Sequence, residues 1–216
     1  MSGIFIVFEG IDGCGKTTQV NRALLYLRLK FGLDAVKATK DLGGSLLGEE
    51  LRKIMYEKVP PKDMAPGVLD LIFLAGHVQN WKTLVEPWLA EDKIVVSDRW
   101  WPSQFAYGPE RGWDERVAEL YEEMRGPWPD LCIFLYGDPH ALLARANARP
   151  NAEVHQRRKA WNDPEKQMRV GQRYFDLYGH KPGWSPICVD GKSEEQVWIE
   201  VQHYLDFATR NVQCTA

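Results

Sequence analysis

The feature that most restricts the fold is a glycine-rich stretch between an apolar run and a helical pattern. Residues 10–17 have the sequence G-I-D-G-C-G-K-T, which matches the pattern G-x-x-x-x-G-K-[ST]. Residues 4–8, just before it, are apolar, and residues 17–31, at its end, repeat apolar side chains at the helical period. A strand, a glycine turn and a helix in this order surround one point with backbone N–H groups and a helix N-terminus, which suits a phosphate. The pattern predicts that Lys16 reaches the β- and γ-phosphates of a nucleotide and that Thr17 ligates Mg²⁺.

Strands and helices alternate along the rest of the chain. We expect strands at 4–8, 34–39, 93–97, 131–136 and 187–189, and helices at 17–31, 45–56, 67–89, 114–125, 139–149, 164–178 and 193–209. We expect Pro87 to kink or break the helix that contains it, and Ser193 and Gln196 to form a capping box. Apolar strands separated by helices predict an α/β fold, a parallel sheet with helices on both faces. Ligands of such sheets bind beyond the carboxyl ends of the strands.

Composition excludes several classes of protein. The 216 residues, 44% of them hydrophobic, suit a single domain over 1–216. Because 27 Lys and Arg face 30 Asp and Glu, the chain lacks the basic excess of a nucleic-acid binder. No apolar run approaches the roughly 20 residues that span a membrane, and the N-terminus does not resemble a secretory signal. The four cysteines, Cys14, Cys132, Cys188 and Cys214, form no C-x-x-C pair, so we expect reduced thiols and a cytoplasmic location.

Two charged residues follow the apolar strand expected at 93–97. Asp98 is at the strand end where P-loop proteins hold Mg²⁺, directly or through water. Arg99 brings a planar guanidinium to the same end, which suits bidentate contact with phosphate. For Arg99 a surface ion pair is the alternative.

A basic segment follows the strand expected at 131–136. Arg145 and Arg149 are four residues apart and share a helix face, and Arg157, Arg158 and Lys159 follow in a polar stretch. We interpret residues 145–162 as a small lid whose arginines neutralise the transferred phosphoryl group and whose closure excludes water. The alternative is a solvated charged face.

Phe73 and His77 lie one turn apart in the helix expected at 67–89. An aromatic ring and a hydrogen-bonding group at this spacing could stack on a nucleobase and bind its edge. Their spacing alone fits packing in the core better.

Taken together, these segments resemble the thymidylate kinase family of P-loop nucleoside monophosphate kinases over nearly the whole chain. The similar segments are F-E-G-I-D-G-C-G-K-T-T-Q at 8–19, T-K-D-L-G-G-S-L-L-G at 39–48, D-R-W-W-P-S-Q-F-A-Y at 98–107, Pro129-Asp130-Leu131 and Asp138-Pro139. The resemblance implies a P-loop NTPase fold, a homodimer, and transfer of the γ-phosphoryl group of ATP to dTMP with Mg²⁺.

The resemblance also implies roles for individual residues. The expected ATP contacts are Gly10, Asp12, Gly13, Cys14, Gly15, Lys16, Thr17 and Thr18, with Thr17 and Asp98 at the metal. The expected acceptor contacts are Asp12, Lys40 and Arg99 near the phosphate, Phe73 against the base, His77 at the base edge, and Ser103 and Tyr107 on base or sugar. The expected catalytic cations are Lys16, Arg99, Arg145, Arg149 and Arg157.

The chain departs from the family on the acceptor side. His77 replaces an arginine that recognises a thymine carbonyl, Lys40 replaces an arginine, Leu42 replaces a proline, and Gly108-Pro109 replaces Gln-Gly. Another pyrimidine deoxynucleotide, including a modified one, is therefore an alternative acceptor, and a deoxynucleoside kinase is the alternative enzyme. A nucleotide-dependent switch would need an N-K-x-D motif that we do not find. The intact motifs at 15–17 and 98–99 oppose a non-catalytic scaffold.

Overall fold

The central element of the fold is a parallel sheet. The computed structural model describes residues 3–59, 63–148 and 163–212. In this part of the chain five strands pair in the order β2-β3-β1-β4-β5, and every neighbouring pair is parallel. The strands are β1 (Ile4–Gly10), β2 (Val36–Lys40), β3 (Ile94–Asp98), β4 (Leu131–Tyr136) and β5 (Trp184–Cys188). The α/β fold expected from the sequence is confirmed.

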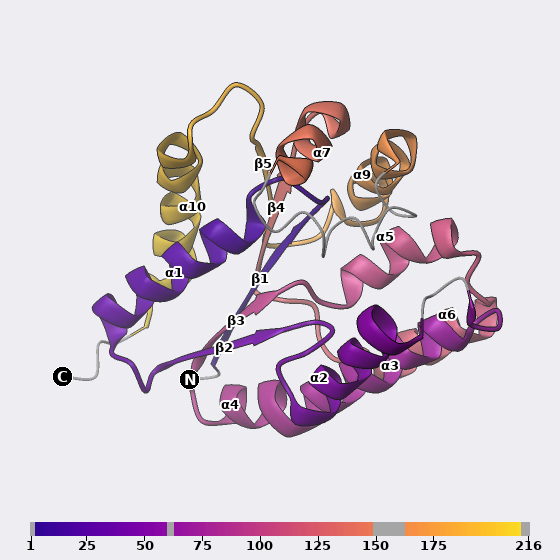
Figure 1. Cartoon of the computed structure of the whole chain (residues 1–216). Helices are drawn as coiled ribbons and strands as arrows, with labels where there is room; N and C mark the ends of the chain where they lie inside the picture. Colours follow the sequence, from indigo (N-terminus) through magenta and orange to yellow (C-terminus); the bar gives the residue numbers. More distant parts are fainter. Residues whose placement is uncertain (1–2, 60–62, 149–162, 213–216) are drawn as a thin grey trace.

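Helices cover both faces of this sheet (Figure 1). Helices α1 and α10 pack together on one face, and α3, α5 and α9 lie on the other, where α6 packs on α3 and α7 on α9. The helices are α1 (Lys16–Phe31), α2 (Leu46–Lys53), η1 (Ile54–Lys58), α3 (Val68–Asn80), η3 (Trp81–Val85), α4 (Glu86–Ala90), α5 (Trp101–Arg111), α6 (Glu115–Met124), α7 (Pro139–Asn147), α9 (Pro164–Tyr178) and α10 (Glu194–Thr209). None of them, in the described part of the chain, is long and apolar enough to cross a membrane.

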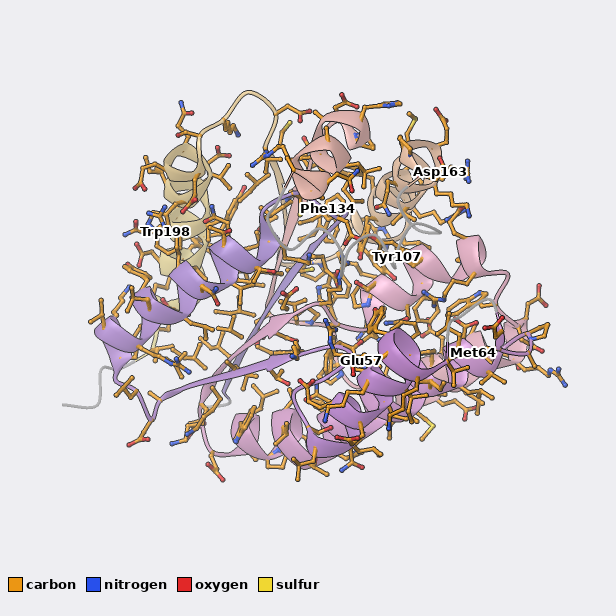
Figure 2. All side chains as sticks on the ribbon, in the orientation of Figure 1. Glu57, Met64, Tyr107, Phe134, Asp163 and Trp198 are labelled. Carbon is orange, nitrogen blue, oxygen red and sulfur yellow. The ribbon has the colours of Figure 1, made fainter. Side chains whose placement is uncertain are left out.

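The core forms around β1 because this strand is central and apolar on both sides. Phe5, Ile6, Val7 and Phe8 are each at most 1% exposed. Full burial of such a side chain stabilises the folded state by about 1.5–3 kcal/mol relative to its exposure to water. The other strands add residues such as Phe134, which packs on aromatic side chains of α9, and its position in the interior is marked in Figure 2. The register sets Phe8 beside Asp98 and Gly10 beside Leu135, so the carboxyl ends of β1, β3 and β4 meet at one edge.

The structure contains one helix that the sequence did not predict. Helix α5 begins with Pro102 in its first turn, where no hydrogen-bonded backbone N–H is needed, and ends at Gly112, which has a left-handed φ of 65°. Gly108 and Pro109 are helix-breaking residues that lie near its end. These residues hid the helix, although each occupies a position that a helix tolerates.

Other elements differ in their bounds. The segment 68–90 is helical throughout, because the π-helical turn η3 joins α3 to α4. Pro87 lies in the first turn of α4 and does not break it. Strand β5 begins three residues before the predicted 187, and helix 45–56 divides into α2 and η1. The capping box of Ser193 and Gln196 is confirmed.

Candidate active site

The loop between β1 and α1 has the backbone that its glycines predict. Gly13 and Gly15 have φ values of 85° and 88°, in the left-handed region that favours glycine. A Cβ atom at Gly13 would collide with the carbonyl oxygen of Leu142, so only glycine fits there. Gly15 directly precedes α1 and receives no side-chain cap, which leaves the N–H groups of the first turn directed at the loop.

Lys16, Thr17 and Asp98 come together at the carboxyl ends of β1 and β3. The Lys16 Nζ lies 3.8 Å from Asp98 Oδ1, and the Thr17 hydroxyl donates a 3.4 Å hydrogen bond to Asp98 Oδ2. Among the described residues, no group of three or more His, Cys, Asp and Glu could hold a metal. Mg²⁺ retains several waters and needs only one or two carboxylates besides phosphate oxygens. The Thr17 and Asp98 oxygens fit that requirement.

Arg99 connects the loop to the sheet edge beside it. Its Nη2 donates to Asp12 Oδ1 and its Nη1 donates to Ser103 Oγ, both at 3.1 Å. Arg99 has a φ of 70°, which is unusual for any residue other than glycine. Its backbone N–H donates a 2.9 Å hydrogen bond to the Phe8 carbonyl oxygen. Backbone strain of this kind persists where surrounding contacts hold the residue in place. The sheet thus fixes the direction of the guanidinium.

A buried carboxylate, Glu9, organises the residues around Arg99. Its Oε1 accepts the Trp100 N–H at 2.9 Å, and its Oε2 accepts the hydroxyls of Ser103 and Tyr174 at 2.6 and 2.8 Å. Burial raises the pKa of Glu9 above its ordinary value, while Arg99 and these hydrogen bonds act in the opposite direction. The network locks Ser103 and Arg99 in one geometry.

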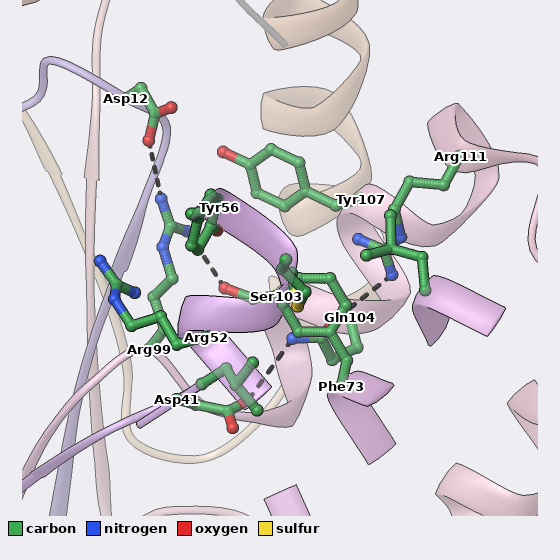
Figure 3. A pocket seen from close by; sticks show the side chains of 13 residues that line it. Asp12, Asp41, Arg52, Tyr56, Phe73, Arg99, Ser103, Gln104, Tyr107 and Arg111 are labelled. Atoms are coloured by element: carbon green, nitrogen blue, oxygen red, sulfur yellow. Dashed lines mark hydrogen bonds and ion pairs between the residues drawn. The ribbon is translucent and has the colours of Figure 1, made fainter. Parts of the chain in front are cut away.

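An open cavity begins at this network, and its empty volume, including the solvent at its mouth, is ≈ 800 Å³. Figure 3 shows Asp12, Arg52 and Arg99 on one side of it and Phe73 and Arg111 on the other. Its lining is formed by Asp12, Asp41, Leu42, Arg52, Met55, Tyr56, Leu69, Phe73, Arg99, Ser103, Gln104, Tyr107 and Arg111. Cations near the loop and an aromatic ring at the far end suit a ligand with an anionic end and a flat apolar end.

The structure brings most of the predicted acceptor residues to this cavity. Asp12, Phe73, Arg99, Ser103 and Tyr107 all line it. The Tyr107 ring lies 5.3 Å from the Arg99 guanidinium, a cation–π contact, and its hydroxyl donates to Gln167 at 3.2 Å.

Two predicted acceptor residues lie elsewhere. Lys40 does not line the cavity, and its Nζ pairs with Glu49 at 2.7 Å. His77 is fully buried: its Nε2 is 2.9 Å from the Arg125 carbonyl oxygen, and its ring packs on Trp100 at 4.2 Å between centroids. Because α3 turns His77 into the core while Phe73 faces the cavity, the expectation that His77 contacts the acceptor is corrected. The core alternative is the one that its burial supports.

Sequence reasoning missed several lining residues. Arg52 comes from α2, whose first turn Ser45 caps by accepting the Gly48 N–H. Its signal was a cation about one helical turn after Gly48, the last residue of the segment 39–48. Gln104 and Arg111 come from α5, and no signal could assign them a direction while that helix was unrecognised.

A second hollow, of ≈ 550 Å³, lies on the other side of the phosphate loop. Cys14, Gly15, Thr18 and Arg145 all line it, so three of the eight predicted ATP contacts and one predicted lid arginine share this space. Arg149, Arg157, Arg158 and Lys159 lie outside the described residues.

The comparisons with known proteins all match this chain to one protein family. Residues 8–200 match the family model described as thymidylate kinase. A thymidylate kinase of Synechococcus sp. (strain RCC307) is 32% identical over 94% of this chain and 95% of its own length. A thymidylate kinase of Bifidobacterium longum subsp. infantis is 30% identical over 94% of this chain and 85% of its own length. The crystal structure of thymidylate kinase from Ehrlichia chaffeensis superimposes with a TM-score of 0.72 at 25% identity, covering 95% of this chain and all of the other.

Proposed function

Because this chain belongs to the thymidylate kinase family, we propose that it transfers the γ-phosphoryl group of ATP to dTMP, giving dTDP and ADP. The observation that carries the proposal is the position of Arg99. Its guanidinium contacts Asp12 of the phosphate loop and also lines the cavity. A cation shared by two neighbouring sites suits transfer between two phosphates that would otherwise repel each other.

The triphosphate side consists of the loop and its lysine. The N–H groups of the loop and of the first turn of α1 would hold the β- and γ-phosphates, with Lys16 neutralising them. Mg²⁺ held by Thr17 and Asp98 would supply further positive charge at the phosphates. Arg145, at the second hollow, is a proposed lid cation, and so are Arg149 and Arg157. The protein contributes position and charge, and no covalent intermediate is needed.

The acceptor side orients the monophosphate. Arg52 and Arg99 would hold its phosphate, so the sugar lies near Asp12, Ser103 and Tyr107 and the base reaches Phe73. Arg52 takes the place that the sequence predicts for Lys40, whose ammonium pairs with Glu49. This orientation presents a phosphate oxygen to the γ-phosphoryl group in line with the loop.

We further propose that the enzyme is a cytoplasmic homodimer whose partners are nucleotides. The thiols of Cys14, Cys132 and Cys188 are free in the described part of the chain, which agrees with a reducing compartment.

The test is release of ADP from ATP and Mg²⁺ with a panel of acceptors: dTMP, dUMP, dCMP, dGMP, dAMP, 5-hydroxymethyl-dUMP and thymidine. We expect preference for dTMP. The Lys16→Ala variant should lose about a hundredfold or more in kcat, as expected when a cation that stabilises the transition state is removed. Preference for a different monophosphate would overturn dTMP as acceptor, and activity on thymidine alone would favour the deoxynucleoside kinase. A Lys16→Ala enzyme with full turnover would overturn the active-site assignment.

A further inference from the structure

We propose that Arg111, from α5, recognises the acceptor base by donating a hydrogen bond to its C4 carbonyl, and that Asp70, from α3, is the positioning residue that holds Arg111 there. The inference rests on the proposed function, because it concerns the base of the monophosphate in the same cavity. It assigns the base edge to a helix that the sequence did not reveal.

Arg111 is held by contacts that direct its guanidinium at the cavity. Its Nε donates a 2.6 Å hydrogen bond to Asp70 Oδ1, and its Nη2 donates a 3.2 Å hydrogen bond to Gln104 Oε1. The side chains of Arg111 and Asp70 are only 6% and 3% exposed, and Arg111 still lines the cavity. A guanidinium has five N–H donors in a fixed plane. The hydrogen bonds to Asp70 and Gln104 use two of them, and the fork geometry suits a third, in-plane acceptor.

The guanidinium lies next to the ring on which a base would stack. The Arg111 Cζ lies over the Phe73 ring, 5.0 Å from its centroid. This is a cation–π contact, which fixes the guanidinium beside the place where a base would pack. A planar base that packs against Phe73 would present its edge to the N–H groups of Arg111.

The cavity's polarity selects the edge. Arg52 and Arg99 lie at the opposite side from Arg111, so a monophosphate bound by them points its base toward Arg111 (Figure 3). In a pyrimidine the C4 substituent is far from the sugar. Thymine and uracil carry a carbonyl oxygen there, which accepts a hydrogen bond. Cytosine carries an amino group, a hydrogen-bond donor that would meet the N–H donors of Arg111. Arg111 would therefore favour dTMP and dUMP over dCMP.

An ion pair that only ties α3 to α5 is the competing interpretation. It predicts that changes at Arg111 alter stability and affect all acceptors alike. Recognition of a carbonyl predicts an effect that depends on the atom at C4. Substitution of oxygen by sulfur at this position separates the two, since sulfur is a weak acceptor.

The experiment measures kcat/KM for dTMP, 4-thio-dTMP and 2-thio-dTMP with the native enzyme and with Arg111→Lys. Lysine keeps a counter-ion for Asp70 but lacks the fork that can serve a carboxylate, an amide and a base at once. We expect the native enzyme to prefer dTMP over 4-thio-dTMP by about tenfold or more, as for the loss of a hydrogen bond to a charged group, with a smaller effect of 2-thio substitution. In Arg111→Lys the preference should fall to about twofold or less while the KM for ATP stays unchanged. Asp70→Asn should reduce the preference in the same direction.

The matched control is Arg169→Lys, because Arg169 pairs with Glu110, the neighbour of Arg111, and does not line the cavity. It should keep the native preference. If the native enzyme accepts dTMP and 4-thio-dTMP equally, the inference is overturned. This test needs no variant, so it holds even if Arg111→Lys folds poorly. Retention of the full preference in a folded Arg111→Lys would also overturn it. Failure of the proposed function is distinct: the native enzyme would not phosphorylate dTMP at all.

Discussion

At the scale of single residues, binding of the acceptor phosphate depends on Arg52. Its guanidinium lies at the cavity and 5.1 Å from the centroid of the Tyr56 ring, a cation–π contact that directs the side chain. We predict that Arg52→Ala raises the KM for dTMP by about tenfold or more and leaves the KM for ATP within about twofold, since a charged hydrogen bond to the acceptor alone is lost. Steady-state kinetics with each substrate varied in turn measures both values.

Arg116→Ala is the control for removal of an arginine. Arg116 is 85% exposed, and its ion pair is with Asp114, at the start of α6. The control should behave as the native enzyme. Equal changes in both KM values for Arg52→Ala would contradict the assignment of Arg52 to the acceptor.

A second prediction at this scale concerns the buried Glu9. In the native protein its two carboxylate oxygens accept hydrogen bonds from Trp100, Ser103 and Tyr174. The Glu9→Gln variant has one amide oxygen and cannot accept all three. We expect the free energy of unfolding to fall by about 1–3 kcal/mol and kcat to fall with it, because Arg99 loses its orientation. Urea denaturation and steady-state rates test this. Tyr174→Phe, which removes one donor only, should have the smaller effect, and a fully stable, fully active Glu9→Gln would refute the role of the network.

At the scale of elements, the sequence predicted what periodicity and glycine position determine. The strand, loop and helix around Lys16 follow from local backbone chemistry, and so do Asp98 and Arg99 at the end of β3. Helix α5 escaped prediction because Gly108 and Pro109 normally interrupt helices. The spacing of Phe73 and His77 favoured the core, where His77 lies, and it was the family resemblance that assigned His77 to the base edge. The apolar pattern of α3 could not show that Phe73, unlike His77, faces the cavity.

Helix α5 is tied to α9 by an ion-pair network that predicts a pH dependence. Arg169 and Arg173 both contact Glu110 at 2.7 Å. The hydrogen bond from Arg169, followed by that from Arg173, lowers the pKa of Glu110 from 4.5 to about 2. A carboxyl with a lowered pKa stabilises the folded state above its unfolded pKa, and this contribution disappears as pH falls toward the folded value.

We therefore expect Glu110→Gln to destabilise the protein at neutral pH and to have less effect as pH falls from 4.5 toward about 2. Because Arg169 is half exposed, the neutral-pH effect should be only about 1 kcal/mol. Urea denaturation at a series of pH values measures the difference between native and variant. A difference that grows at acid pH would contradict this account of the network.

At the scale of the whole molecule, the proposed homodimer needs an apolar face. Helices α3 and α6 pack side by side, and each exposes apolar side chains, Leu71 at 48% and Leu120 at 40%. We predict that sedimentation gives about twice the chain mass of 24.8 kDa and that Leu71→Lys with Leu120→Lys gives the monomer. Leu29→Lys, on an exposed position of α1, is the control and should leave the dimer intact. A native monomer would contradict the assembly.

The fold brings two sites together at the carboxyl ends of β1 and β3, and the central claim is that a phosphoryl group passes between them. The direct measurement is incubation of the protein with ATP labelled at the γ-phosphate, Mg²⁺ and unlabelled dTMP, followed by chromatographic separation of the products. The account predicts that the label appears in dTDP, one for each ADP formed, and that Lys16→Ala lowers its rate of appearance by about a hundredfold or more. Label released only as inorganic phosphate, or absent from dTDP at every dTMP concentration, would contradict it.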